Sequence, residues 1–386
     1  MSSAIQPVPS EDGAKRLAAI VLAAGYSSRM AEFKPLLPLA GSTALELCIG
    51  LFRAAGITEV ITVLGHRAEE LQPLAERAGA RCVGNPRFEQ GMFSSIAAGS
   101  RALPSWVDAA FVLPADIPLV RPNTIRQLAT SFVMRRSGIV YPVFEGRRGH
   151  PPLIVRKILG ETTEEGASGP LSDLLARHES EAINLFVTDQ GIQMDMDTPA
   201  DYDQLRALAA DREIPTRTEC ESILAGQFVE TSVVRHSRLV AKVAQRIADA
   251  LVRSGLTLNV ELVQAGALLH DLAKGWPEHA SVGAELLRSM DFSRVATVVG
   301  AHTDLDFSGG GIDESAIVYL ADKLVRGEEL VTIDQRFQPA LERFRDDPAA
   351  LRAAQSRMAT VKAVALAVET RLGASLASVV DEAGKS

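Results

Sequence analysis

The first half of the chain alternates short, mainly apolar runs with amphipathic segments. Four of the apolar runs predict buried strands, at residues 17–23, 59–64, 109–113 and 138–143. Helical patterns lie between and after them, at residues 44–55, 69–78, 94–103, 123–134 and 200–210. Strands that are apolar on both faces and alternate with helices are typical of a mostly parallel sheet covered on both sides. We therefore expect an α/β domain over residues 15–212, with ligands bound beyond the carboxyl ends of its strands.

The second half shows a different pattern. A polar stretch at residues 211–218 is typical of a linker. Helical periodicity follows it, at residues 233–252, 260–272, 280–290, 315–325 and 358–372, with no convincing strand among them. We expect an all-α domain over residues 213–386.

Composition narrows the class of protein. The 386 residues are 47% hydrophobic and 23% charged, as in folded chains, and no apolar run approaches the ~20 residues of a membrane-spanning helix. The first residues have neither the basic start nor the apolar core of a secretion signal. Three widely spaced cysteines argue against a disulfide framework. A net charge of −8 disfavours a basic nucleic-acid-binding face. We therefore expect a cytoplasmic protein with neither nucleic acid nor membrane among its partners.

A loop of small residues follows the first predicted strand and contains candidate phosphate ligands. It begins with Leu22, Ala23, Ala24 and Gly25, and small residues let backbone amides approach an anion closely. Arg29 and Lys34 add positive charge that can neutralise a triphosphate and its departing pyrophosphate. The same loop is also compatible with an ordinary turn between a strand and a helix.

Two aspartates are candidate magnesium ligands. Asp116 follows the strand at 109–113, and Asp197 precedes the helix at 200–210. A carboxylate beyond a strand end is well placed to hold Mg²⁺ against a nucleotide. Each one taken alone is also typical of a turn or of a helix cap. Two further loops carry polar side chains, at residues 85–95, which include Ser94, and at residues 147–152, which include His150.

Together these segments resemble the molybdenum-cofactor nucleotidyltransferase family, and most of all its molybdopterin cytidylyltransferase branch. The shared motifs are Leu-Ala-Ala-Gly…Arg-Met…Lys, Asn-Pro…Gly…Ser-Ile, Pro-Ala-Asp-x-Pro, Arg-Gly-His-Pro and Asp-x-Asp-Thr-Pro, in this order. The resemblance implies a Rossmann-like fold that transfers CMP from CTP to molybdopterin and releases pyrophosphate. It implies that residues 22–25, Arg29, Lys34, Ser94 and His150 bind the nucleotide and cofactor. Arg29, Lys34 and Asp116 would be catalytic, and Asp116 and Asp197 would hold Mg²⁺.

The chain differs from this family at two places. Ala31 stands where a glycine commonly follows Arg-Met, and residues 169–171 match the glycine-rich substrate loop poorly. Asp195 would lie beside the metal ligands. Ala24 occupies a position where the guanylyl branch usually has glycine, which favours CTP over GTP by analogy.

Six residues of the second half interrupt apolar helical faces or lie at helix ends. They are His236, His270, Asp271, His279, His302 and Asp322. Each one alone is more typical of a cap or of a hydrogen-bonded core residue. An unpaired imidazole or carboxylate is costly to bury, so these groups need partners, and a shared metal centre supplies them. Mixed imidazole and carboxylate ligands favour Mn²⁺ or Fe²⁺ over Mg²⁺ alone.

The order of these residues resembles the HD-domain metal-dependent phosphohydrolases over residues 228–330. The resemblance implies that His236, His270, Asp271 and Asp322 hold one metal ion. It implies that His279 and His302 serve a second ion, with Asp271 bridging the two. Two divalent ions together can activate water and clamp a phosphate for in-line attack. Lys274 is either a catalytic cation that neutralises this phosphate or a solvated lysine at a helix end.

The leading hypothesis is a bifunctional enzyme that combines cytidylyl transfer to molybdopterin with hydrolysis of a phosphoester or nucleotide. One alternative keeps nucleotidyl transfer but directs it to a sugar or polyol phosphate. Another makes the chain a cofactor-binding chaperone that docks on a molybdenum hydroxylase apoenzyme. A chaperone has no need of intact Asp116, Asp197 and six metal ligands, so the sequence favours an enzyme.

Overall fold

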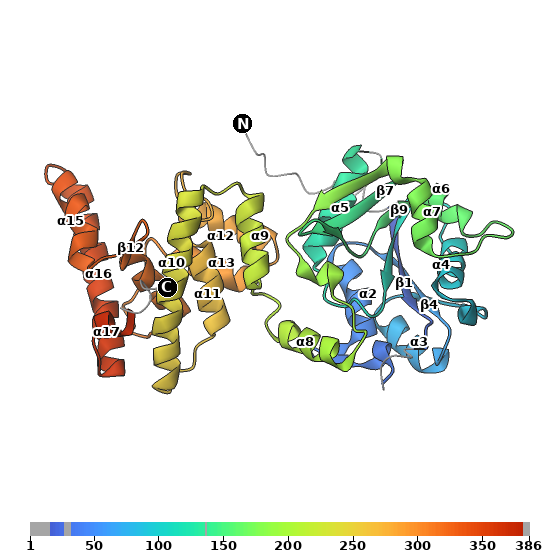
Figure 1. Cartoon of the computed structure of the whole chain (residues 1–386), viewed down its shortest axis with the longest axis horizontal. Helices are drawn as coiled ribbons and strands as arrows, with labels where there is room; N and C mark the ends of the chain where they lie inside the picture. Colours follow the sequence, from blue (N-terminus) through green and yellow to red (C-terminus); the bar gives the residue numbers. More distant parts are fainter. Residues whose placement is uncertain (1–15, 27–31, 136, 381–386) are drawn as a thin grey trace. The chain divides into compact units, whose positions relative to one another are not determined.

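The computed structural model describes residues 16–26, 32–135 and 137–380. Contacts divide the chain into two compact units, of which the first ends at Arg212 and the second begins at Glu213 (Figure 1). No helix among the described residues has the length and apolar character needed to cross a membrane.

The first unit is built on an eight-stranded sheet in the order β10-β7-β9-β6-β1-β4-β5, with β8 paired to β7. Its strands are β1 (Leu17–Ala23), β4 (Glu59–Leu64), β5 (Arg81–Gly84), β6 (Ala109–Pro114), β7 (Ile139–Phe144), β8 (Arg147–Arg148), β9 (Leu153–Val155) and β10 (Ala182–Phe186). Strand β1 is parallel to both β4 and β6, whereas β9 runs antiparallel between β6 and β7. The mostly parallel sheet is therefore confirmed. Strand β9 has only three residues, too few to show a pattern in the sequence.

Helices cover both faces of this sheet (Figure 1). One face carries α2 (Ala44–Ala54), α3 (Ala68–Arg77) and α5 (Pro122–Arg135), and the other carries α4 (Met92–Arg101), α6 (Arg156–Glu161) and α7 (Leu171–Arg177). Side chains of β1 alternate between the two cores, with Val21 on the α2 side and Ile20 on the α4 side. A Cβ at Gly99 would lie 2.5 Å from Ile20 Cγ2, so this glycine lets α4 approach the sheet closely.

The remaining elements of the first unit are short, apart from α8 (Pro199–Ala210). They are η1 (Lys34–Leu36), β2 (Pro38–Leu39), β3 (Ser42–Thr43), η2 (Phe88–Gln90), η3 (Glu179–Glu181) and η4 (Gln190–Gln193). Helix α8 begins with a capping box in which Thr198 and Asp201 bond each other's backbone amides, with Pro199 in the first turn. Thr198 is therefore the cap, and Asp197, directly before it, does not serve that purpose.

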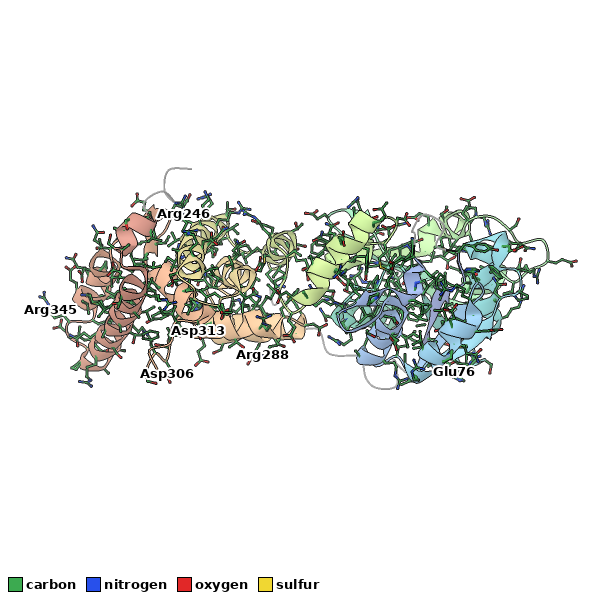
Figure 2. The ribbon with its side chains drawn as sticks, turned by 90° about the horizontal axis from the view of Figure 1, so that it is seen from below. Glu76, Arg246, Arg288, Asp306, Asp313 and Arg345 are labelled. Carbon is green, nitrogen blue, oxygen red and sulfur yellow. The ribbon has the colours of Figure 1, made fainter. Side chains whose placement is uncertain are left out.

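The second unit is helical, with one small hairpin. Its helices are α9 (Arg217–Gly226), α10 (Thr231–Arg253), α11 (Val260–Leu269), α12 (His279–Ser289), α13 (Ser293–Ala301), α14 (Glu314–Lys323), α15 (Ile333–Arg343), α16 (Pro348–Leu372) and α17 (Leu376–Val380). They enclose one apolar core, and charged side chains such as Asp306 and Arg345 lie on the outside (Figure 2).

Two expectations about this unit were wrong in detail. Helix α9 starts at Arg217, inside the stretch expected to be a linker, because Thr216 and Glu219 form a capping box there. Strands β11 (Val325–Arg326) and β12 (Glu329–Leu330) pair as a hairpin where no strand was expected. Two residues per strand are too few to produce an alternating pattern, and Gly327 with a positive φ of 62° makes the turn.

Candidate active sites

The first candidate site lies at the carboxyl ends of β1 and β6. These strands are parallel neighbours, so their ends meet at the same edge of the sheet. The Ala115 amide donates a hydrogen bond to the Leu22 carbonyl, which extends the pairing to the residue before Asp116. The Met196 amide donates to the Asp116 carbonyl at 3.0 Å and brings the segment around Asp197 to the same edge. Backbone pairing thus joins segments about 80 residues apart in the chain.

Lys34 lies between the two aspartates. Its Nζ is 2.7 Å from Asp197 Oδ1 and 3.2 Å from Asp116 Oδ2. Burial lowers the pKa of Lys34, but the bond to Asp197 and the charge of Asp116 outweigh burial and raise it above its ordinary value. The aspartate side chains keep 28% and 36% of their surface exposed, so both stay accessible to a cation from solution. Three of the predicted site residues therefore meet, while Arg29 lies outside the described residues.

The charge of Asp116 acts on two further side chains, those of Asp195 and His150. Burial, followed by the charges of Asp197 and Asp116, raises the pKa of Asp195. Burial lowers the pKa of His150 even though Asp116 acts in the opposite direction. His150 Nδ1 is buried and has no hydrogen-bond partner among the described residues. A neutral imidazole with an unpartnered nitrogen is suited to contact a bound ligand.

Ser94 faces a cavity of about 860 Å³. Its hydroxyl accepts a hydrogen bond from Asn85 Nδ2 at 2.9 Å and lies 2.8 Å from the Arg87 carbonyl. Residues 162–169 also line this cavity, and Gly169 is the first residue of the stretch that differs from the related family. The structure thus places Ser94 at a ligand-sized cavity, in a part of the unit that the sequence assigned to substrate binding.

Sequence reasoning missed a group of aromatic side chains beside the loop after β1. The Tyr26 ring lies 4.9 Å from His66 and 5.4 Å from Phe88, and the Tyr26 hydroxyl donates to Glu89 at 2.9 Å. The His66 amide donates to the Ala24 carbonyl at 3.1 Å and so fixes the start of the loop. These rings are spread over more than 60 residues of sequence, and no periodicity connects them.

The second candidate site gathers all six predicted ligand residues of the helical unit. These residues form two groups, and within each group the ligand atoms lie within 4.8 Å of one another. His236, His270 and Asp271 form the first group, and Asp271, His279 and His302 form the second. Asp271 Oδ1 lies 3.3 Å from His279 Nε2 and 3.5 Å from His302 Nε2. Its Oδ2 lies 3.5 Å from His270 Nε2. The two oxygens of Asp271 thus face different groups.

Asp322 completes the first group. Its Oδ1 lies 3.2 Å from His236 Nε2 and 3.6 Å from His270 Nε2. The histidines come from the amino-terminal part of α10 and the carboxyl end of α11, and Asp322 comes from α14. These three helices pack on a common core, which is why residues 86 positions apart can share a site.

Backbone carbonyls orient three of the imidazoles. Nδ1 of His236 lies 2.9 Å from the Gly327 carbonyl, that of His270 lies 2.8 Å from the Ala267 carbonyl, and that of His302 lies 2.6 Å from the Val299 carbonyl. A proton on Nδ1 satisfies each carbonyl and leaves the Nε2 lone pair directed into the cluster. One of these carbonyls belongs to Gly327, which forms the turn of the β11–β12 hairpin. No pattern in the sequence indicated this hairpin.

The electrostatics of the cluster fit a cation. Burial alone would lower the pKa of His270, but Asp271 and Asp322 raise it to about 10. Burial would raise the pKa of Asp271, yet hydrogen bonds from the surrounding histidines hold it far below its usual range. His270 Nε2 is fully buried, and its nearest carboxylate oxygens are too distant for a good hydrogen bond. Once its proton is displaced, this buried nitrogen and the two carboxylates that face it offer the imidazole and carboxylate ligands that a divalent first-row ion takes.

Two lysines accompany this cluster. Lys274 Nζ lies 3.0 Å from Asp271 Oδ2 and keeps about half of its side chain exposed. Lys323, which sequence reasoning missed, is buried and donates to Asp322 Oδ2 at 2.7 Å. The only sequence signal for Lys323 was its place directly after Asp322.

Comparison with protein families defines the class of each unit. Residues 19–182 match the MobA-like NTP transferase domain, and residues 233–327 match the HD domain. The two matches contain both candidate sites apart from Asp195 and Asp197, which follow the first match. The first unit therefore contains a MobA-like NTP transferase domain, and the second unit contains an HD domain.

Individual relatives match the amino-terminal unit. Molybdenum cofactor cytidylyltransferase of Escherichia coli (strain K12) is 26% identical over 184 residues, which cover 47% of this chain and 92% of the relative. The bifunctional IPC transferase and DIPP synthase of Rubrobacter xylanophilus is 35% identical over 122 residues, which cover 30% of this chain and 27% of the relative. The crystal structure of Rv0371c from Mycobacterium tuberculosis H37Rv is 25% identical, with a TM-score of 0.44, and the match covers 50% of this chain and 98% of that one.

Proposed function

We propose that the amino-terminal unit transfers CMP from CTP to molybdopterin and releases pyrophosphate. The observation that carries this proposal is the convergence of Lys34, Asp116 and Asp197 at the carboxyl ends of β1 and β6. Nucleotidyl transfer requires positioning and charge neutralisation more than covalent catalysis. A lysine supplies positive charge directly, and two accessible carboxylates would supply it through the Mg²⁺ that they hold.

Each residue has a defined part in this reaction. An oxygen of the terminal phosphate of molybdopterin attacks the α-phosphorus of CTP, and the bond from that phosphorus to the β-phosphate oxygen breaks. Backbone amides at Ala24 and Gly25 and the Lys34 ammonium stabilise the charge of the departing pyrophosphate. Asp116 and Asp197 would hold Mg²⁺, which supplies charge neutralisation at the triphosphate when bound. Ser94 and His150 would contact the nucleotide or the pterin.

A sugar or polyol phosphate is the competing acceptor, because a relative named as an IPC transferase rather than a molybdenum cofactor enzyme matches the same unit. Pyrophosphate release separates the two. The full chain is incubated with Mg²⁺ and either CTP or GTP, in the presence of molybdenum-loaded molybdopterin, a sugar 1-phosphate or a polyol phosphate. Release that needs both CTP and molybdopterin supports the proposal. Release with a sugar or polyol phosphate would instead identify that compound as the acceptor. No release with any combination overturns the enzymatic role of this unit.

For the carboxy-terminal unit, we propose hydrolysis of a phosphoester at a two-metal centre. The observation that carries it is that Asp271 belongs to both ligand groups, with one oxygen facing each. His236, His270 and Asp322 would complete the first site, and His279 and His302 the second. A pair of ions such as Mn²⁺ or Fe²⁺ supplies Lewis acidity toward the phosphate when bound. Lys274, exposed beside Asp271, would neutralise phosphate charge as water adds to phosphorus and the ester oxygen leaves.

Metal content and hydrolysis test this second proposal together. Protein stripped with a chelator is reconstituted with Mn²⁺ or Fe²⁺ and assayed for metal stoichiometry and for phosphate release from a panel of nucleotides and simple phosphoesters. Up to two equivalents of metal and metal-dependent hydrolysis support it. A protein that cannot be loaded with either ion overturns it.

A further inference from the structure

Lys323 connects two parts of the metal cluster that belong to different ligand groups. Its Nζ donates one hydrogen bond to Asp322 Oδ2 and another to the backbone carbonyl of His302, both at 2.7 Å. Asp322 completes the first group, whereas His302 belongs to the second. The two bonds therefore join α14 to the carboxyl end of α13 across the cluster.

We propose that Lys323 is a positioning residue that holds the two metal sites at a fixed separation and restricts Asp322 to ligation through one oxygen. The inference rests on the two-metal centre proposed above.

The two oxygens of Asp322 have different partners. Oδ1 faces His236 and His270, while Oδ2 is bonded to the ammonium of Lys323. A buried, charge-assisted hydrogen bond withdraws charge from Oδ2 and fixes the orientation of the carboxylate, which disfavours chelation of a metal ion through both oxygens. Because only one oxygen of Asp322 faces the first group, this residue would contribute one ligand atom to the first metal site.

The Lys323 ammonium is buried together with partners that match its charge. Lys323 is only 8% exposed, and a buried ammonium is stable only where its charge and its donors are matched. Asp322 supplies the charge, and the His302 carbonyl accepts a second bond. The ring of Tyr319 lies 4.6 Å from Nζ and offers its negative face to the cation. Burial raises the pKa of Tyr319 to about 12, so the ring stays neutral.

Tyr319, which lies beside Lys323, is in turn held by helix α16. Tyr319 donates its hydroxyl to the Arg357 carbonyl at 3.3 Å, and Arg357 pairs with Asp304, two residues after His302. Helix α16, whose sequence carries no recognisable motif, thus supports the segment that presents His302. Loss of an outer partner of a metal ligand typically lowers metal affinity by ~10–100-fold.

The test measures Mn²⁺ binding to the full chain by calorimetry after metal removal. Lys323→Met preserves the bulk of the side chain and removes its charge, and Lys323→Gln keeps a hydrogen-bond donor. Lys362→Met is the matched control, because Lys362 pairs with Asp334 at 2.8 Å on the exposed surface of the same unit. Replacing Mn²⁺ with Co²⁺ adds a readout of coordination number, since visible absorption weakens as the number of ligands rises.

We expect Lys323→Met to bind at least one Mn²⁺ equivalent ~10–100-fold more weakly and to give a weaker Co²⁺ spectrum, with wild-type behaviour in Lys362→Met. Wild-type affinity and spectrum in Lys323→Met overturn the inference. If Lys323→Met does not fold, the same two criteria are applied to Lys323→Gln. If the wild-type chain itself binds no Mn²⁺, the proposed metal centre fails, and this inference fails with it.

Discussion

In the amino-terminal unit one lysine compensates two partly exposed carboxylates, whereas in the carboxy-terminal unit four histidines surround two buried ones. The first group is contributed by loops and short turns that follow strands. The second is contributed by helix ends and helix faces packed on one core. Loops are suited to admit and release a ligand, whereas packed helices are suited to hold ligand groups at fixed positions.

The two units also stabilise the negative charge of their carboxylates in different ways. The Lys34 ammonium pairs with both Asp116 and Asp197, so an incoming cation competes with it for these carboxylates. In the helical unit, against the effect of burial, hydrogen bonds from His270, His279 and His302 lower the pKa of Asp271, and the charge of Lys323 followed by hydrogen bonds from His236 and His270 lowers that of Asp322. We therefore expect the loss of one ligand to reduce activity more at the helical site than at the sheet-edge site.

The largest effect is expected at the bridging carboxylate. Asp271→Asn should remove both metal equivalents and abolish phosphohydrolysis, because both groups lose a charged ligand. Nucleotidyl transfer should be unchanged. Metal analysis with parallel assays of both activities checks this, with Asp346→Asn on the surface of the same unit as control. Retention of two equivalents would show that Asp271 does not bridge.

A smaller loss is expected at the sheet edge. Asp116→Asn should slow pyrophosphate release by ~10²–10³-fold, as the removal of one preorganised electrostatic group commonly does. Hydrolysis at the other site should stay at the wild-type rate, since Asp116 belongs to the first unit alone. Steady-state rates of both reactions test this, with Asp203→Asn on the exposed side of α8 as control. A parallel loss of hydrolysis would show that the two sites are coupled.

Removal of a ligand that serves only one group should have a partial effect. His279→Ala is expected to lose one of the two metal equivalents and to retain the other, because His236, His270 and Asp322 remain in place. His236→Ala should lose the other equivalent. Metal titration of both variants measures how many equivalents each one retains. Loss of both equivalents in each case would mean that the cluster binds its ions as a single cooperative unit.

The smallest effects are expected from helix caps, which lie outside both sites. Thr43→Ala at α2 and Thr216→Ala at α9 each break a capping box and should lower the free energy of unfolding by ~1 kcal/mol. Both activities should persist at permissive temperature. Thermal unfolding combined with the two assays measures this, and a selective loss of one activity would place that cap in a functional role.

Much of this molecule was predictable from local pattern. The runs at residues 17–23 and 59–64 became β1 and β4 with the expected bounds, because strands buried on both faces need continuous apolar sequence. The six metal-ligand candidates were recognisable because each interrupts an apolar helical face. Strands β9, β11 and β12 were missed, since two or three residues cannot display a period.

The sequence by itself determined the two classes of domain and the chemistry that each can hold, because periodicity and residue type are local properties. Only the tertiary structure decided that Lys34 pairs with both Asp116 and Asp197, that Asp271 faces two groups, and that Lys323 joins them. Such contacts depend on which strand ends and helix ends become neighbours. That choice is made by packing of the whole core, and no short stretch of sequence records it.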